Sequence, residues 1–280
     1  MAWIDETRQH APLLDDDADA LLLRLTAAAA HESVLGRAAS QPRTVGLYGH
    51  AQAAKAHLLT ALCSSGSGRI NVKAGEKSFD YLSHINPGHA LTGMALRFTT
   101  AVQNVDDAFP LRLRLISEAE LVQVFIAHAA GQQERHLVDR AVIEDRLNRW
   151  RGLRQPHPVA GLTAEDVGAI AAFWRTTVPA AQQQIDDGLW YQLATLIPSL
   201  DLRARASAWS LLWGEQQELT QQWLALAHVL HQTGNAAELA APLSLLVDNF
   251  ALPTEGFLNP LAAESIEAQA EVVVHPLSKD

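Results

Sequence analysis

The sequence has almost no cysteine, because Cys63 is the only one among 280 residues. A single cysteine excludes an intrachain disulfide framework and favours a reducing compartment. Cys63 ends an apolar segment with helical spacing, and we expect its side chain to pack as a small buried hydrophobe.

Long hydrophobic runs are also missing. Charged or amide residues interrupt every apolar stretch well before the roughly 18 to 20 residues that a membrane span needs. The N-terminus, Met1 to Arg8, lacks a basic segment followed by an apolar core, so no secretory signal is visible. We therefore expect a cytoplasmic protein without a membrane span, and we leave open an export route that needs no signal.

Basic residues are few and scattered, with 21 Lys and Arg against 31 Asp and Glu and a formal charge of -10. Because phosphate neutralisation needs clustered cations, this balance argues against a nucleic-acid partner. Hydrophobic residues make up 48% of the chain, which is enough to bury a sizeable core in one large or two small domains.

The most informative stretch covers residues 44–62. Its apolar start, Thr44 to Tyr48, predicts a strand buried in a sheet. Gly49 follows, then four residues, then Ala54-Lys55-Ala56 at the start of an apolar helical pattern. This order is the layout of a phosphate-binding P-loop.

Two signature positions of that P-loop are substituted. Gly49 and Lys55 fit, whereas Ala54 replaces a glycine that lets the backbone approach phosphate, and Ala56 replaces the hydroxyl residue that binds Mg²⁺. The bare motif therefore favours an ordinary strand, turn and helix, with Lys55 solvated at the helix start.

Downstream motifs add a family resemblance. Residues 46–62, read together with Ile85-Asn86-Pro87, Thr92-Gly93 and Arg97-Phe98-Thr99, resemble the SrfC-like bacterial virulence factor family. The resemblance is distinctive over roughly residues 40 to 125 and loose beyond. The N-terminal part of that family looks like a P-loop GTPase related distantly to dynamin-like proteins, and its members are considerably longer than this chain.

The resemblance implies a weak site for GTP or ATP with Mg²⁺, and Thr92 would stand where a switch threonine meets the metal and the γ-phosphate. The alternative for Thr92 is a turn residue, and we interpret Arg97 as a solvated strand side chain. The implied nucleotide-binding residues are Gly49, Ala54, Lys55, Ala56 and Thr92.

A P-loop NTPase also needs an apolar strand that ends in an acidic residue supporting the metal. The one candidate, Leu245 to Asp248, follows Pro242 and reads as the end of a helix. Whether the chain is an enzyme stays open. If it is active, it is a GTPase or another NTPase, but the substituted loop argues for a pseudo-enzyme without catalytic residues.

Beyond residue 132 the strand patterns stop and helical spacing continues to about residue 250. Ser117 to Glu120 is a capping box that opens the preceding helix. Six of the seven tryptophans lie in this half, and we interpret them as core residues because aromatic side chains bury the most surface.

Histidines are numerous but form no metal motif. His228 and His231 have no third ligand nearby in the sequence, so we interpret them as surface or packing residues. His128 sits at an apolar helical position, which favours a core histidine. His50 and His57 flank the loop, although nothing in their spacing requires contact with a phosphate.

These patterns predict an α/β protein that has a P-loop NTPase-like, mostly parallel sheet and a large all-helical C-terminal part. We place an N-terminal helical segment at 1–39, the degenerate P-loop-like α/β domain at 40–130, a helical domain or insertion at 131–250 and a tail at 251–280. The tail has room for one short strand, Val272 to Val274. Two functions follow. The chain is a SrfC-like virulence factor with a degenerate nucleotide-binding loop and weak or no hydrolysis. Alternatively, it is a non-enzymatic module that docks protein partners of a virulence-associated operon or complex.

Overall fold

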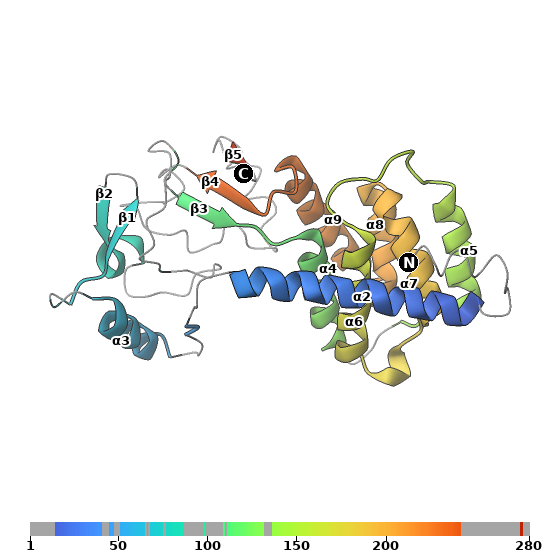
Figure 1. The fold of residues 1–280 in the computed structure, drawn as a ribbon, viewed down its shortest axis with the longest axis horizontal. Helices are drawn as coiled ribbons and strands as arrows, with labels where there is room; N and C mark the ends of the chain where they lie inside the picture. The colour runs from blue at the N-terminus through green and yellow to red at the C-terminus, as the bar shows by residue number, and fades with distance from the viewer. Residues whose placement is uncertain are drawn as a thin grey trace. The chain divides into compact units, whose positions relative to one another are not determined.

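The computed structural model describes residues 15–40, 45–47, 51–64, 66, 68–74, 77–86, 98, 109, 111–131, 136–241 and 275–276. The chain divides into two compact units, coloured along the sequence in Figure 1. One comprises residues 1–42 and 116–235, and the other comprises residues 43–115 and 236–280. The domain limits drawn from the sequence stay a prediction.

All regular elements of the first unit, within its described residues, are helices. α2 packs against α6 and α7, while α4 lies against α6 and α9. The helices are α2 (Asp15–Ser40), α4 (Glu118–Ala130), α5 (Arg140–Arg151), α6 (Ala164–Thr177), α7 (Asp187–Leu196), α8 (Leu202–Trp209) and α9 (Gln217–Gln232), with short 3-10 turns at η4 (Ala180–Gln182), η5 (Ile197–Ser199) and η6 (Ser210–Trp213).

The first helix is longer than its apolar pattern predicts. The spacing of Leu14, Leu21, Leu25 and Ala28 predicts a helix over residues 13–30, whereas α2 continues to Ser40. Residues 31–39 contain only one strongly unfavourable helix residue, Gly36, which costs about 1 kcal/mol relative to alanine. Pro42 is the first residue that strictly opposes helix, because it lacks the backbone donor and restricts the residue before it.

Tryptophans fill the core of this unit, as the sequence predicts. Ring contacts join Phe125 to Trp213 at a centroid distance of 5.5 Å and Trp174 to Trp190 at 5.8 Å. The side chains with no exposed surface include Trp174, Trp190, Trp209, Trp213 and Trp223. These five aromatic rings therefore stabilise the fold and are not available to dock a partner.

The second unit contains one α-helix and short strands among its described residues. A hairpin of β1 (Asn71–Ala74) and β2 (Lys77–Asp80) leads into the π-helical turn η2 (Tyr81–Ile85). A second sheet has the order β3 (Leu111–Arg114), β4 (Glu238–Ala241) and β5 (His275–Pro276). A small hydrophobic core of this unit joins Leu59 of α3 (Gln52–Cys63) to residues of and beside the hairpin, namely Ile70, Phe79, Tyr81 and Ile85.

These sheets contradict the predicted P-loop-like parallel sheet. Every strand pair in the described residues is antiparallel. Val45 to Leu47, the described part of the expected first strand, has no regular secondary structure, and Val45 is 80% exposed. So short an apolar run does not distinguish a buried strand from an exposed loop, because periodicity needs a longer window. The predicted α/β class is therefore wrong.

The other strand predictions have mixed outcomes. The alternating segment from Arg69 contains β1, and the segment from Leu111 is β3, so both are confirmed as strands. The segment expected at Met94 to Phe98 lies outside the described residues, apart from Phe98 itself, which packs edge-on against Tyr81 with 4.8 Å between ring centroids.

Candidate functional site

The structure describes three of the five residues predicted to bind a nucleotide. Ala54, Lys55 and Ala56 lie in the first two turns of α3, whereas Gly49 and Thr92 lie outside the described residues. The Lys55 amide donates to the Ala51 carbonyl at 3.1 Å, which is an ordinary helical bond. Ala54 is exposed, while Lys55 and Ala56 are half-buried.

The start of α3 has no cap of its own. Ala51 supplies no side-chain acceptor, and the first turn contains no acidic residue. The first amide groups of the helix are therefore left to solvent or to an anion, which the helix dipole favours. Thr60 lies one turn after Ala56 on α3, and its hydroxyl donates to the Ala56 carbonyl at 2.8 Å. Ala56 itself has no hydroxyl, which a P-loop needs at this position to bind Mg²⁺.

Several other predicted side chains lie elsewhere than expected. Cys63 is exposed and not buried. His128 is exposed because the buried face of α4 is formed by Leu121, Phe125 and their neighbours, and His128 falls outside that face. Helical spacing alone does not show whether a residue lies within the buried face of a helix or just beside that face.

Three further histidines lie at the surface of their helices. His228 and His231 are exposed on α9, as a surface role predicts, and His57 is exposed on α3. Within the described residues, no group of three or more His, Cys, Asp or Glu side chains is arranged to hold a metal ion. His50, Arg97 and the segment from Leu245 to Asp248 lie outside the described residues.

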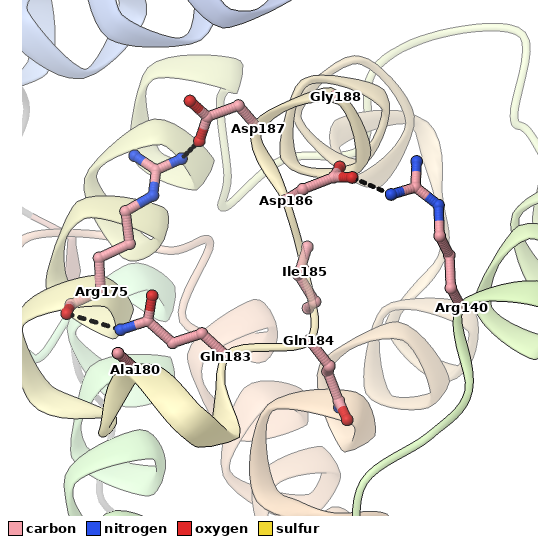
Figure 2. Close-up of a pocket in the computed structure, with 9 residues that line it drawn as sticks. All are labelled: Arg140, Arg175, Ala180, Gln183, Gln184, Ile185, Asp186, Asp187 and Gly188. Carbon is pink, nitrogen blue, oxygen red and sulfur yellow. Dashed lines mark hydrogen bonds and ion pairs between the residues drawn. The ribbon is translucent and has the colours of Figure 1, made fainter.

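The helical unit has an open pocket of about 850 Å³ beside the start of α7 (Figure 2). Arg140 reaches it from α5 and Arg175 from α6. Asp186, the N-cap of α7, accepts from the Leu189 amide at 2.9 Å and also pairs with Arg140. Asp187 pairs with Arg175 on the other side of the pocket.

The polar groups of this pocket already have partners in the protein. Gln183 Nε2 donates to the carbonyls of Arg175 at 2.9 Å and Val178 at 2.8 Å. Gln184 Oε1 accepts from the Val138 amide at 2.7 Å. Because these bonds connect neighbouring elements, we interpret the pocket as the place where polar side chains join α5, α6 and α7.

A buried ion pair joins two other helices of the unit. Arg205 of α8 donates from Nη1 to Glu118 Oε2 of α4 at 2.6 Å, and the two side chains are 0% and 2% exposed. The guanidinium also donates to backbone carbonyls at 2.6 to 3.2 Å, namely those of Val159, Ala160, Ile197 and Pro198. This saturated set of bonds is a structural crosslink and leaves the arginine inaccessible to a ligand.

Sequence reasoning missed this pair, since its members are 87 positions apart. Glu118 lies in the first turn of a capped helix. A carboxylate at this position ordinarily faces solvent and is stabilised by the helix dipole. Burial raises the pKa of Glu118 to about 7, although the charge of Arg205 opposes the rise. The nearby negative charge of Asp166 raises the pKa of Glu118 further.

A helical unit with a tryptophan-rich core, combined with small antiparallel sheets, defines a mainly helical class of protein. The chain belongs to the family described as "putative bacterial virulence factor", whose sequence model matches residues 1–256. Among curated proteins and among solved structures, nothing matches the chain. None of the described helices has the length and hydropathy needed to cross a membrane.

Proposed function

We propose that the chain is a non-enzymatic protein-interaction module of a virulence-associated complex, of the SrfC-like kind. The observation that carries this proposal is the outer face of α3. Leu58 is 49% exposed and Leu62, one turn later, is 66% exposed. Ala54 and Ala61 lie exposed beside them, and Leu59 is the only buried residue of the helix.

An exposed row of apolar side chains at helical spacing is the arrangement with which amphipathic helices engage partners. The chemistry of the described residues supports the same conclusion. The charged groups of the pocket and of the core are paired, and the tryptophans are buried, so binding through an apolar surface is the activity that these residues support best.

Capture of partners from the native cell tests this function. We expect the wild type to retain a specific associate, and we expect the double variant Leu58→Ser/Leu62→Ser to lose it. His57→Ser changes an exposed polar residue of the same helix and serves as the matched control, which should retain the associate. Circular dichroism would verify that all forms fold. A wild type that stays monomeric and captures nothing specific would contradict the proposal.

A second candidate function is weak binding of a nucleotide phosphate by Gly49, Ala54, Lys55, Ala56 and Thr92. Its support is the uncapped start of α3 together with the intact Lys55. Because Ala56 lacks a hydroxyl, we expect any binding to be weak and any hydrolysis to be slow or absent.

Titration with GTP and ATP, with and without Mg²⁺, tests this second function. Binding that Lys55→Ala abolishes would support it, and absence of binding at millimolar nucleotide would reject it. In the variant Ala54→Gly/Ala56→Ser we expect Mg²⁺-dependent affinity to rise if the loop can cradle phosphates. The cytoplasmic location and the lack of a nucleic-acid partner stay predictions.

A further inference from the structure

Helix α5 and the turn after it carry an excess of positive charge, although the chain as a whole is acidic. Residues 140–154 contain five arginines, at positions 140, 146, 149, 151 and 154, against the two acidic residues Glu144 and Asp145. The whole chain has a formal charge of -10. This short segment therefore has the opposite sign to the protein that carries it.

Three of these arginines have carboxylate partners. Arg140 pairs with Glu144 and Asp186, Arg146 pairs with Glu215, and Arg149 pairs with Asp145. Their charges are therefore compensated within the helical unit, and they contribute little to the recognition of another charged molecule.

Arg151 and Arg154 are held by neutral groups instead. Arg151 donates from Nη1 to Asn148 Oδ1 at 2.6 Å and from Nη2 to Gln192 Oε1 at 2.8 Å. Arg154 donates from Nε to Ser199 Oγ at 3.2 Å. In the part of the chain that the structure describes, neither forms an ion pair, although both are exposed.

These neutral contacts orient the two side chains and leave their charge in place. Gln192 belongs to α7 and Ser199 ends η5, so both arginines are anchored along the same α7–η5 segment. A guanidinium has five N–H donors, and the bonds above use only some of them. Because the side chains are already ordered, binding a ligand costs less conformational entropy.

An exposed leucine lies between the two arginines. Leu153 is 52% exposed, and its amide donates to the Trp150 carbonyl at 2.9 Å in the turn that ends α5. Arginine is enriched over lysine at protein interfaces, and the exposed leucine adds apolar surface beside the two arginines.

We propose that Arg151, Leu153 and Arg154 form a docking surface for an acidic segment of a partner protein, with an apolar side chain of that segment seated between its carboxylates. This inference rests on the proposed interaction function and specifies that one partner presents an acidic segment. Guanidinium groups bind carboxylates through paired hydrogen bonds, which makes them specific for this chemistry.

A purely structural role for the same arginines makes a different prediction. Basic residues in the last turn of a helix stabilise its dipole, and this applies to Arg149 as much as to Arg151. Arg149 lies on the same helix and is exposed, but Asp145 already compensates its charge. It is therefore the matched control for the docking surface.

Fluorescence anisotropy with the full chain tests the proposal. The probe is a labelled peptide with one leucine between pairs of glutamates, and the reference peptide carries glutamines in their place. We expect the acidic peptide alone to bind wild type, with about tenfold loss of affinity in Arg151→Gln/Arg154→Gln and less than about twofold loss in Arg149→Gln. Leu153→Ser should also weaken binding, by about threefold.

Equal losses in Arg149→Gln and in the double variant would overturn the proposal, because they would indicate binding by diffuse charge. Tighter binding of a single-stranded oligonucleotide than of the peptide would overturn it as well. If the peptide does not bind while partner capture from cells persists, this surface is rejected and the proposed function stands. If nothing is captured in any form, the proposed function itself fails.

Discussion

Gly161 and its surroundings show how much of the helical unit depends on single residues. Its backbone has a φ of +105°, a conformation that side chains other than glycine rarely adopt. A Cβ at this position would lie 2.6 Å from Glu118 Oε2 and 3.0 Å from Asn235 Oδ1. The buried ion pair of Glu118 and Arg205 is therefore formed against a residue that can only be glycine.

We expect Gly161→Ala to lower the free energy of unfolding by about 3 kcal/mol, because it combines backbone strain with a clash against a buried carboxylate. Urea unfolding followed by circular dichroism measures the loss. Gly188→Ala is the control, since the nearest atom to its new Cβ would be Asp186 Oδ1 at 3.6 Å. That variant should change stability by no more than about 1 kcal/mol, and equal effects would contradict the account.

The buried carboxyl of Glu118 predicts a pH dependence of stability. Its pKa is raised from 4.5 to about 7 by burial. Because the folded-state pKa lies above the unfolded one, the stability from this group is fully present below about pH 4.5 and is lost as the pH rises through about 7. The shift corresponds to roughly 3 kcal/mol.

We expect the unfolding free energy of wild type, relative to that of Glu118→Gln, to fall by roughly this amount from pH 4.5 to about pH 8. Glutamine has the shape of the protonated acid and does not titrate, so it isolates this group from all others. Urea titrations of both proteins across this range measure the difference. A relative stability that rises with pH would mean that attraction to Arg205 outweighs the burial of Glu118.

Among the elements, helices were predicted better than strands. The capping box at Ser117 was read from the sequence and is present, with the Glu120 amide donating to Ser117 Oγ at 3.1 Å and the Ser117 amide donating to Glu120 Oε2 at 2.8 Å. Such contacts join residues three positions apart, so local sequence specifies them. A sheet is defined by partners from distant segments, as β3 and β4 illustrate.

We expect Ser117→Ala to lower the free energy of unfolding by about 1 kcal/mol, because the first turn of α4 loses its cap. Thermal or urea unfolding measures the change. Thr195 is exposed on α7 and donates only to the Gln192 carbonyl within the same helix. Thr195→Ala should therefore cost less than about 0.5 kcal/mol, and a larger loss in this control would refute the capping explanation.

For the whole molecule, the tryptophans of the described residues form a buried core that stabilises the helical unit. Trp209 and Trp213 are fully buried near the junction of α8 and η6, and Trp213 Nε1 donates to Thr220 Oγ1 at 2.9 Å. We propose that recognition instead uses Leu58 and Leu62 on α3 and the arginines at the end of α5 and just beyond it.

Burial of the tryptophans predicts a blue-shifted emission that iodide scarcely quenches in the native protein, because a charged quencher does not enter a packed core. Six of the seven tryptophans are buried, and the seventh, Trp3, lies outside the described residues. Trp3→Phe therefore isolates the buried set. Strong quenching of this variant before unfolding would show that the tryptophan core is open to solvent.

The sequence by itself determined the helices of the second half, the capping box at Ser117, the tryptophan core and the membership of a virulence-factor family that the resemblance anticipated. These properties depend on local spacing, composition and motifs. Only the tertiary structure decided that the strands are antiparallel, that Val45 and Cys63 face solvent, and that Glu118 meets Arg205. Strand direction and burial depend on which distant segments come together, and a short motif such as residues 44–62 carries no information about its partners.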